Sequence, residues 1–432
     1  MTVNTIAVVG MGYVGMPLAV AFATKHYKVI GFDTNTSKIN LYRNGIDPTK
    51  EVGDDVIDKT QVCFTDDPTT LNSADLIIIA VPTPVTDEHL PDLSPLEGAC
   101  NIVGQHMKPN TIICFESTVY PGVTEDICAP LIENASKMKC GVDFKIAYSP
   151  ERINPGDKLH TLQTIKKIIS GMDEDTAVTI QNVYNSVVDA GTFKVSNIKT
   201  AEAIKVTENT QRDVNIAFIN EMALIYEKLG IDINEVVDGM NTKWNALKFR
   251  PGLVGGHCIG VDPYYLSFIA EKYNVDNKLI TSSRQINESM SNHVVTETIK
   301  KMVLAGQTPK TAKVAVLGIT FKENCPDCRN SKVYDIITGL NQYDIHPMII
   351  DPWANANEIE HIYGTQLLTF NDLHDLDCII LAVAHNQFKE MQLHDIMKFY
   401  SNDDNHKKVL IDIKGIYAPN DLNATGLVWW QL

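Results

Sequence analysis

Positive charge is scarce in this chain. The 432 residues contain 37 Lys and Arg against 53 Asp and Glu, which gives a formal net charge of −16 at pH 7. A polyanion would meet a repulsive average field, so nucleic acid is excluded as an expected partner. A small nucleotide phosphate is not excluded, because backbone N–H groups at a helix start and a few local cations act at short range.

The sequence also has no leader-like pattern at its start, no long apolar run and no cysteine framework. Its start, MTVNTIAVVG, has no basic stretch before an apolar segment, and no apolar run approaches the thickness of a bilayer. Nine cysteines without framework spacing fit a reducing compartment. We therefore expect a cytoplasmic protein without a membrane partner. The lone CxxC of Cys325 and Cys328 favours a loop over a zinc site or a redox dithiol, and no ligand cluster suggests a metal.

The length and the 44% hydrophobic content allow two or three domains. Residues 1–196 predict a doubly wound α/β domain with a Rossmann fold, because short apolar runs alternate with helical sequence. We expect these runs to form a parallel sheet that helices cover on both faces. The runs lie at 5–10, 74–84, 111–118 and 144–151.

A different pattern follows. Residues 197–306 have apolar residues at helical spacing, and the stretch 197–230 has no Pro or Gly before Gly230, which predicts one long helix. Residues 307–432 return to alternating strands and helices from KVAVLGITFK onward, so they predict a second α/β domain. One glycine follows its first strand where the first domain has three. It is therefore Rossmann-like without a dinucleotide fingerprint, and the two α/β ends have the character of a diverged pair.

Gly10, Gly12 and Gly15 form a GxGxxG between a predicted strand and a predicted helix. The first glycine permits a tight turn, the second lets a pyrophosphate approach the backbone, and the third lets the helix pack closely on the sheet. Asp33 ends the next strand, where a carboxylate binds ribose hydroxyls and repels a 2′-phosphate. This pattern favours NAD over NADP. The alternative is a glycine-rich turn that binds nothing.

Three polar positions suggest chemistry beyond the cofactor. Lys205 and Asn209 are four residues apart on the long helix, so they share a face that can steady a developing alkoxide or oxyanion. Cys258 stands in the glycine-rich stretch GGHCIGVDP, four residues before Asp262. Small neighbours let a thiol approach a ligand, and a nearby cation or helix end favours its thiolate form. The alternatives are a solvated helix face and a buried, inert cysteine.

Taken together, the motifs resemble the nucleotide-sugar 6-dehydrogenase family, which includes UDP-glucose, GDP-mannose and UDP-N-acetylhexosamine dehydrogenases. The resemblance runs nearly end to end. Its segments are GMGYVGMPLA, ESTVYPG at 116–122, SPERINPGD at 149–157, the helix with Lys205 and Asn209, FRPGLVGGHCIGVDPYYL at 249–266 and GITFKENCPDCRNSK at 318–332. It implies an N-terminal NAD-binding Rossmann domain, a central helical dimerisation domain with a long connecting helix, and a C-terminal Rossmann-like domain that binds a UDP-sugar.

The resemblance also implies roles for single residues. Cys258 would capture an aldehyde, while Lys205 and Asn209 would hold the oxygen that becomes negative. Asp262 and Thr118 would handle the proton and the water, and Glu151 would assist thioester hydrolysis. The implied cofactor contacts are Gly10, Gly12, Tyr13, Val14, Gly15, Asp33, Thr83, Thr118 and Arg329. The implied substrate contacts are Glu151, Arg152, Lys205, Asn209, Phe249, Arg250, Gly255 and Lys322. For Arg250, a solvated position at a helix end is the alternative.

A thiol has a clear purpose in such an enzyme. Oxidation of a primary alcohol to a carboxylate removes four electrons, and NAD accepts two at a time. The intermediate aldehyde must therefore be held while the cofactor is exchanged. A cysteine thiolate holds it as a thiohemiacetal, which loses a second hydride to become a thioester that water opens.

The cysteine loop indicates the sugar. In family members that use UDP-glucose or GDP-mannose it resembles GGSCFPKD, whereas here His257 replaces the Ser and Val261 replaces the Lys. This form is similar to enzymes of UDP-N-acetylhexosamines, with UDP-GlcNAc favoured, UDP-GalNAc next, and UDP-ManNAc or UDP-glucose as alternatives. The product would serve surface polysaccharide synthesis. His257 is alternatively a structural hydrogen-bonding residue.

Two other classes of function remain open at this point. A two-electron dehydrogenase of the hydroxyacid type also begins with a βαβ unit and has a long central helix, but it would leave Cys258 without a task. A non-catalytic dinucleotide sensor or scaffold would leave the other polar positions without one. We also expect at least a homodimer, because the long helix would otherwise expose an apolar stripe.

Overall fold

The computed structural model describes residues 2–153, 159–402 and 406–432. The chain packs into two compact units, Met1–Asn209 with Val261–Asp276 and Thr210–Gly260 with Asn277–Leu432. The predicted domain ranges 1–196, 197–306 and 307–432 divide the chain on another basis and stay a prediction. Across the three described stretches, no helix has both the length and the apolarity that a bilayer crossing requires.

The first unit contains a sheet with the strand order β3-β2-β1-β4-β5-β6-β7-β8. Its first six positions follow the order 3-2-1-4-5-6 of a Rossmann fold, so the sequence prediction is correct in this respect. Its strands are β1 (Thr5–Val9), β2 (Lys28–Phe32), β3 (Cys63–Thr65), β4 (Leu76–Ile79), β5 (Ile112–Phe115), β6 (Lys145–Tyr148), β7 (Lys167–Gly171) and β8 (Thr192–Lys194).

The four predicted runs form β1, β4, β5 and β6, which pair parallel as expected. β7 lies outside those runs, and it pairs antiparallel with β6 although it pairs parallel with β8. Parallel neighbours need a crossover connection, usually a helix. The described parts of the β6–β7 connection, 149–153 and 159–166, contain no helix. An apolar run alone does not reveal the direction of its strand.

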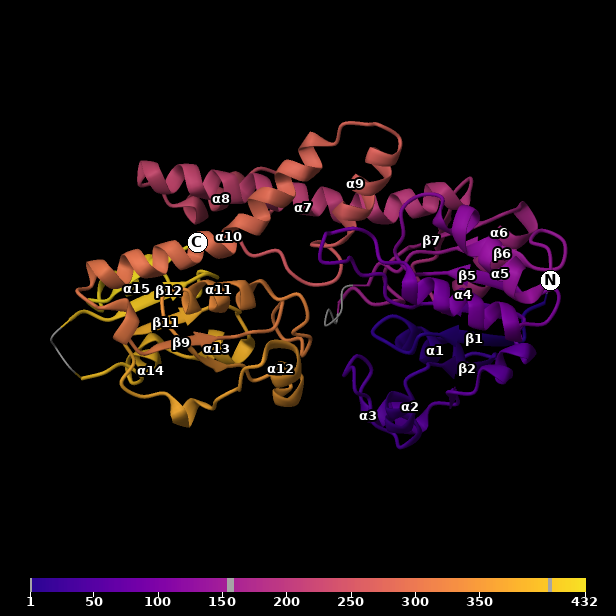
Figure 1. Ribbon diagram of the computed structural model, residues 1–432, viewed down its shortest axis with the longest axis horizontal. Helices are drawn as coiled ribbons and strands as arrows, with labels where there is room; N and C mark the ends of the chain where they lie inside the picture. Colours follow the sequence, from indigo (N-terminus) through magenta and orange to yellow (C-terminus); the bar gives the residue numbers. More distant parts are fainter. Residues whose placement is uncertain (1, 154–158, 403–405) are drawn as a thin grey trace. The chain divides into compact units, whose positions relative to one another are not determined.

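Helices cover both faces of this sheet, as the continuous apolar runs predict. Ala7 and Val9 of β1 pack with residues of α4 and α5, whereas Ile6 and Val8 pack with residues of α1 and α6. Figure 1 labels these elements, which are coloured from indigo to magenta. The helices are α1 (Gly15–Ala23), α2 (Thr36–Arg43), α3 (Asp54–Lys59), α4 (Ser94–His106), α5 (Ala129–Ser136) and α6 (Glu174–Asn185).

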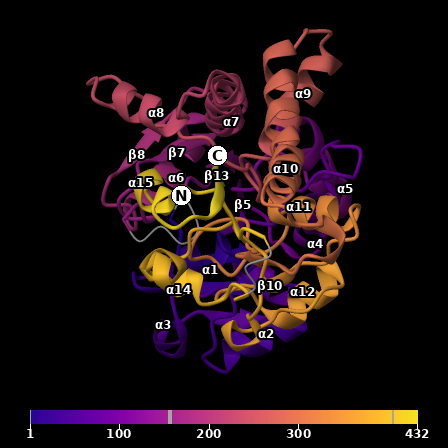
Figure 2. The same cartoon turned by 90° about the vertical axis from the view of Figure 1, so that its left-hand side faces the viewer.

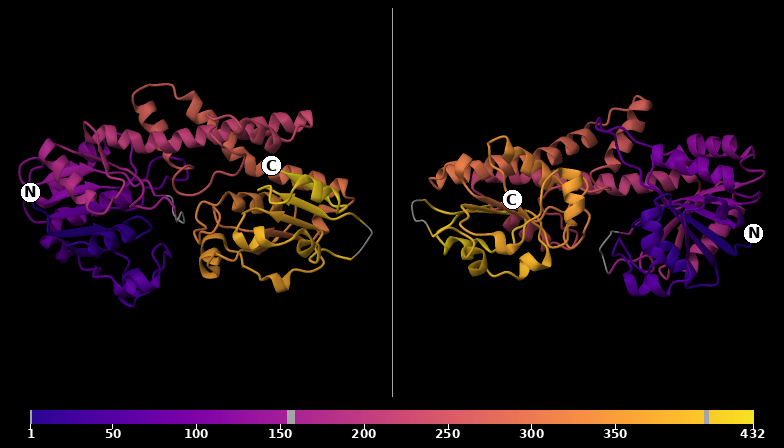
Figure 3. Two further views of the ribbon diagram at one scale, coloured as in Figure 1. Left: turned by 180° about the vertical axis from the view of Figure 1, so that it is seen from behind. Right: turned by 60° about the horizontal axis from the view of Figure 1, so that its bottom comes forward.

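The predicted long helix is α7, which runs unbroken from Ile198 to Leu229 (Figure 3). Its first three turns belong to the first unit, where they share a core with α9 (Asp262–Lys272). Ala201 and Val206 of α7 and Val261 and Tyr265 at α9 are buried in that core. This packing brings the polar residues of α7 close to the first residue of α9.

The second unit contains the rest of α7 and a parallel sheet in the order β10-β9-β11-β12-β13. This is the order 2-1-3-4-5 of the other common doubly wound fold. Residues of α10 and α11 pack on one face, and residues of α13 and α14 pack on the other (Figures 1 and 2). The strands are β9 (Val314–Leu317), β10 (Met348–Ile350), β11 (Cys378–Leu381), β12 (Val409–Asp412) and β13 (Val428–Gln431). The helices are α8 (Ile233–Asn241), α10 (Lys278–Leu304), α11 (Lys332–Asn341), α12 (Ala356–Tyr363), α13 (Asn386–Glu390), α14 (Leu393–Met397) and α15 (Pro419–Asn423).

The turns after β1 and β9 have the same geometry. Gly10 and Gly318 each have φ of +95°. The residue after each glycine donates its backbone N–H to an aspartate that follows the neighbouring strand, at 2.9 Å for Asp33 and 2.7 Å for Asp351. The turns differ in which side chain binds the aspartate. Lys38, with a side chain that is 30% exposed, pairs with Asp33 at 2.8 Å, whereas the fully buried ring of His385 contacts Asp351 at 3.1 Å. The second turn thus keeps the architecture of the first but has its carboxylate covered by a buried ring.

The first turn allows a test that separates folding from cofactor binding. A Cβ at Gly10 would lie 2.8 Å from the Ala80 carbonyl oxygen, whereas a Cβ at Gly12 would meet no atom within 4 Å. We expect Gly10→Ala to lower the free energy of unfolding by about 3 kcal/mol, through positive φ and overpacking. Gly12→Ala should stay within about 1 kcal/mol of the wild type but weaken binding of NAD, the cofactor that the fingerprint predicts.

Urea unfolding and calorimetric titration with NAD measure the two effects. Equal loss of stability in both variants, or unchanged NAD affinity in a folded Gly12→Ala protein, would contradict the assignment.

Candidate active site

The predicted NAD site has the geometry that this cofactor needs. Asp33 accepts hydrogen bonds from the backbone N–H of Met11 and of Asn35, both at 2.9 Å, and pairs with Lys38 at 2.8 Å. The carboxylate is thereby held at the end of β2. Gly15 packs so closely that a Cβ would lie 1.9 Å from the Gly10 carbonyl oxygen, while the space over Gly12 is open. Tyr13 and Val14 are half-buried at the start of α1.

Thr83 and Thr118 follow neighbouring parallel strands. Thr83 comes after β4 and Thr118 after β5, and both are half-buried. The loops that carry them are tied down: Ser117 donates its hydroxyl to the Val81 carbonyl at 2.6 Å, and Tyr265 donates to the Pro84 carbonyl at 2.8 Å. Both threonines therefore lie at the carboxyl edge of the sheet, where α/β folds bind ligands.

Lys205, Asn209 and Asp262 form a buried polar group. Their exposed fractions are 8%, 5% and 2%, and Asn209 donates its side-chain N–H to the Asp262 carboxylate at 2.6 Å. Burial raises the pKa of Asp262 to about 6, against the opposing effects of the Lys205 charge and the Asn209 hydrogen bond. The predicted shared face of Lys205 and Asn209 is therefore turned inward toward Asp262 and not to solvent. A carboxylate with this pKa exchanges protons near neutral pH.

Glu151 belongs to a second buried group. Its Oε2 contacts the Lys167 ammonium at 2.8 Å, and its Oε1 accepts the backbone N–H of Arg152 and of Ile153, both at 2.6 Å. Lys167 also contacts Glu116 at 2.7 Å. The Arg152 guanidinium points to other partners, since it pairs with Glu208 at 2.6 Å. Residues 154–157 of the predicted SPERINPGD segment lie outside the described residues.

Another buried carboxylate supports the segment after Thr118. Glu202 of α7 is fully buried and accepts the backbone N–H of Gly122 at 2.6 Å and of Thr124 at 2.9 Å. Burial raises its pKa to about 7, although these hydrogen bonds lower it. Glu202 thus ties the ESTVYPG segment to the helix that carries Lys205.

An aspartate of the second unit contacts the cysteine loop. The Asp327 carboxylate contacts His257 of this loop at 3.0 Å, and it also pairs with Arg329, two residues further along the chain, at 2.7 Å. Burial acts on Asp327, but His257 and Arg329 outweigh it and hold its pKa well below the usual range. His257 therefore makes the structural hydrogen bond that the sequence left as one of two readings. Cys258 next to it is exposed.

The glycines of this loop lie against the segment that follows β9. The Gly256 N–H donates to the Asn330 carbonyl at 3.0 Å, and the Asn330 side chain donates back to the Gly256 carbonyl at 2.7 Å. A Cβ at Gly255 would lie 2.6 Å from the Asn330 carbonyl oxygen. Only glycine allows this approach.

A pocket opens where the strand order of the second sheet reverses, between β9 and β11. Its lining combines loop residues Leu253 and Gly255 with three lysines, Lys322, Lys332 and Lys414. Doubly wound folds bind ligands at such a switch point. The cluster of cations suits a phosphate-bearing ligand, although Lys332 also pairs with Glu288 and Lys414 pairs with Glu323 at 2.7 Å.

Two predicted substrate contacts lie elsewhere in the second unit. Phe249 packs at the edge of the core and lines a different cavity, next to α8. Arg250 is exposed and pairs with Asp238 of α8, so its guanidinium is engaged in a surface ion pair. The CxxC residues Cys325 and Cys328 are buried in the loop between β9 and α11, at 1% and 0% exposure.

Sequence reasoning missed Lys167, Glu116 and Glu202. Only Lys167 left a usable signal, because a lysine inside the apolar run KIIS requires a buried partner if that run is a central strand. Glu116 lay inside a quoted motif, and Glu202 lies one turn before Lys205 on the same helix, but neither had a sequence feature that set it apart.

The raised pKa of Asp262 predicts a pH dependence of stability. An acid whose pKa is higher when folded binds more protons in the folded state, so its contribution to stability falls as the pH rises from about 4 to about 6. We expect the difference in unfolding free energy between the wild type and Asp262→Asn to change by roughly 2–3 kcal/mol over this window.

The wild type should lose stability relative to the variant as the pH rises, whatever constant offset the substitution adds. Urea unfolding between pH 4 and pH 8 measures the difference. A difference that stays constant over this range would show that Asp262 titrates normally.

Known proteins resemble this chain over almost its whole length. It is 47% identical over 426 residues to Protein CapL of Staphylococcus aureus, covering 99% of both chains. It is 45% identical to the UDP-N-acetyl-D-glucosamine 6-dehydrogenase of Pseudomonas aeruginosa, covering 91% of this chain and 93% of that one. The structure of the UDP-D-ManNAc dehydrogenase of Pyrococcus horikoshii matches with a TM-score of 0.88 and 32% identity, covering 99% of this chain and 98% of that one.

Three family models match successive parts of the chain. They describe the NAD binding domain over residues 4–188, the central domain over 199–289 and the UDP binding domain over 315–419. The NAD binding model covers the glycine turn and Asp33, and the UDP binding model covers the lysines around the second switch point. The resemblance seen in the sequence is thus confirmed, and the chain belongs to the UDP-glucose/GDP-mannose dehydrogenase family of NAD-dependent oxidoreductases.

Proposed function

We propose that this enzyme oxidises the C6 hydroxyl of UDP-N-acetylglucosamine to a carboxylate in two NAD-dependent steps, with Cys258 as the nucleophile. The observation that carries the proposal is the buried group of Lys205, Asn209 and Asp262. Asp262 follows Cys258 by four residues in the sequence. A carboxylate that titrates near neutral pH and two donors for a developing oxyanion are the groups that alcohol oxidation needs. The product would serve as a building block for surface polysaccharide.

In the first oxidation, Asp262 accepts the proton of the C6 hydroxyl through a water or directly. Lys205 and Asn209 donate hydrogen bonds to the oxygen as it becomes negative. Bound NAD supplies the chemistry of hydride acceptance, and the turn at Gly12 with the Asp33 carboxylate would hold it. The C–H bond at C6 breaks, the electron pair leaves as hydride, and an aldehyde remains.

The second oxidation needs the thiol. The Cys258 sulfur attacks the aldehyde carbon, and the carbonyl oxygen takes a proton to give a thiohemiacetal. Loss of a second hydride and of the hydroxyl proton leaves a thioester. Water, positioned by Thr118 and deprotonated by Glu151, then opens the thioester, so the carboxylate product leaves and the thiol is restored.

The N-acetylglucosamine substrate is favoured by two observations. Relatives named UDP-N-acetyl-D-glucosamine 6-dehydrogenase are 44% and 45% identical to this chain, against 33% for a UDP-N-acetyl-D-mannosamine dehydrogenase and 31% for an NDP-N-acetyl-D-galactosaminuronic acid dehydrogenase. The hydrogen bond between His257 and Asp327 also sets this loop apart from the serine-containing form. UDP-GalNAc is the second candidate, because it differs only in the orientation of one hydroxyl.

The stoichiometry of the reaction tests the proposal. With excess NAD and limiting UDP-GlcNAc, we expect two NADH per sugar consumed, and a slower reaction or none with UDP-GalNAc, UDP-ManNAc and UDP-glucose. Cys258→Ala should lower kcat by about a thousandfold or more, since it removes the nucleophile. Cys63→Ala, at another exposed cysteine, is the matched control and should keep wild-type turnover.

One NADH per sugar, or full turnover of Cys258→Ala, would instead favour a two-electron dehydrogenase. Binding of NAD without its reduction in the presence of any nucleotide sugar would favour the non-catalytic dinucleotide sensor or scaffold.

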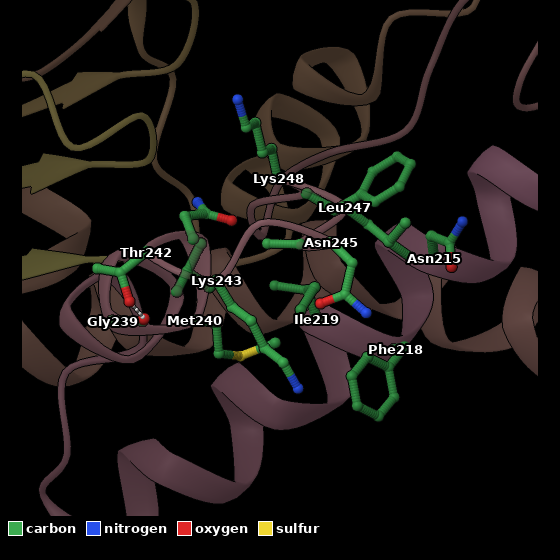
Figure 4. Close-up of a pocket in the computed structure, with 14 residues that line it drawn as sticks. Asn215, Phe218, Ile219, Gly239, Met240, Thr242, Lys243, Asn245, Leu247 and Lys248 are labelled. Carbon is green, nitrogen blue, oxygen red and sulfur yellow. Dashed lines mark hydrogen bonds between the residues drawn. The ribbon is translucent and has the colours of Figure 1, made fainter.

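We further propose that the enzyme is a homodimer formed through α7 and the segment after α8. Phe218, Ile225 and Leu229 form an exposed apolar stripe on α7, at the spacing of successive helical turns. Beside Phe218 lies a cavity of about 520 Å³, which Met240 and Leu247 also line (Figure 4). Trp244, in the segment after α8, is 92% exposed.

An isologous dimer needs a self-complementary surface, and a projecting indole beside an apolar cavity provides one. A second copy of this chain is therefore the occupant that we propose for this surface.

Light scattering at micromolar concentration should give twice the 48.0 kDa of one chain. Trp244→Glu should shift the protein toward monomer, because it places a charge in the centre of the interface. Val142→Glu, at an apolar residue of the first unit with 67% exposure, should leave the mass unchanged. A wild-type monomer at this concentration would refute the dimer.

A further inference from the structure

Among the described residues of the first unit, the most deeply buried ion pairs join Lys167 to Glu116 and to Glu151. Lys167 of β7 and Glu116 after β5 have side-chain exposures of 3% and 0%, and Glu151 has 9%. One ammonium thus lies between two carboxylates, at 2.7 and 2.8 Å. Charges are this deeply buried only when their partners balance them, so the group is a single electrostatic unit.

The two carboxylates of this unit have different neighbours. Glu151 accepts two backbone N–H groups on Oε1, which add to the ammonium on Oε2. Glu116 has the Tyr184 hydroxyl as its other partner. Although burial acts against it, the Lys167 charge and these donors hold the pKa of Glu151 below its usual value. Burial dominates at Glu116 and raises its pKa to about 7. As the pH falls through neutrality, Glu116 is therefore the carboxylate of the two that takes up a proton, while Glu151 keeps its negative charge.

From these contacts we propose that Lys167, held by Glu116, is a positioning residue that keeps the carboxylate of Glu151 ionised and oriented for thioester hydrolysis. This inference rests on the proposed function, in which Glu151 deprotonates water. The three named donors occupy three of roughly four acceptor positions of a carboxylate, which leaves one for a water molecule. Lys167 itself touches neither substrate nor cofactor in this assignment.

Other titratable groups surround the buried group of Lys167, Glu116 and Glu151. Arg152, next to Glu151, pairs with Glu208 of α7. Tyr184 of α6 lies under the Lys167 ammonium, 5.2 Å from ring centroid to Nζ, and its hydroxyl is 4.0 Å from the Cys114 sulfur of β5. Burial raises the pKa of both Tyr184 and Cys114 far above neutral, so both stay uncharged. Burial, and after it the charges of Glu202 and Asp262, raise the pKa of Tyr148 on β6 well above its usual value, so Tyr148 also stays uncharged.

The proposal predicts different effects for substitutions of Lys167 and of Glu116. Lys167→Met removes the balancing cation from a buried carboxylate, so the acidic limb of the kcat–pH profile should move up by about 3–5 pH units, past neutral pH. We expect kcat at pH 7 to fall about 10- to 100-fold as a result. Glu116→Gln leaves the cation in place and resembles the protonated carboxyl group, so the acidic limb should stay within about 0.5 pH unit of the wild type. Lys167→Arg, which restores a cation, should recover kcat to within about fivefold.

A lysine of the neighbouring strand provides the control. Lys145 of β6 pairs with Asp173 at 2.8 Å, but both side chains are more than one-third exposed. Lys145→Met should leave kcat and the pH profile within about twofold of the wild type. A role of Lys167 in folding alone would lower the melting temperature without moving the pH profile.

The experiment measures kcat from pH 5.5 to pH 9 for all five proteins and for Glu151→Gln, with the sugar that the wild type oxidises. A folded Lys167→Met protein with unchanged kcat and profile overturns the proposal. If Lys167→Met does not fold, Lys167→Gln, which removes the charge but keeps a hydrogen-bond donor, decides: an upward shift of the acidic limb supports the proposal and no shift overturns it. An inactive wild type would refute the proposed function itself, whereas an active wild type with a fully active Glu151→Gln would refute only the role of Glu151.

Discussion

Burial of both sheet faces is the constraint on which the rest of this structure depends. Ile6 and Val8 on one side of β1 and Ala7 and Val9 on the other are all covered by helices, so no polar group can emerge from the middle of the sheet. The predicted ligand-binding groups lie at the carboxyl ends of the strands. The glycine turn, Thr83 and Thr118 follow β1, β4 and β5, and in the second sheet the loop with Lys322 follows β9.

The same constraint makes an unpaired charged residue in the interior strongly destabilising. Lys167 begins a buried strand and Glu116 ends one, and each would be strongly destabilising alone. Together with Glu151 they form a closed set of ion pairs. Lys205, Asn209 and Asp262 form another buried polar group, between α7 and α9. The two groups differ in the balance of effects, because burial prevails over the Lys205 charge at Asp262, whereas the Lys167 charge and backbone donors prevail over burial at Glu151.

What the sequence could predict follows from the range of the interactions. The turn at Gly10, the long helix and the pair Lys205–Asn209 are local patterns with fixed spacing, and the structure contains them as predicted. Asp262 was found because it follows the cysteine loop by four residues. Lys167–Glu116 and His257–Asp327 join positions 51 and 70 residues apart, and no local pattern records such a pairing. The direction of β7, outside the predicted runs, has a similar basis, since a connection and not a strand determines it.

In the proposed four-electron oxidation, two carboxylates with opposite pKa shifts would divide the proton transfers. Asp262, raised to about 6 by burial, exchanges protons near neutral pH and suits the step in which an alcohol proton is taken up and passed on. Glu151, lowered by Lys167 and two backbone donors, stays ionised and suits the activation of water. If both had the pKa of Asp262, a fraction of the enzyme would hold the thioester without a base. If both had that of Glu151, neither would readily release the proton as an acid. The difference between the two environments therefore matches the two kinds of proton transfer that the chemistry requires.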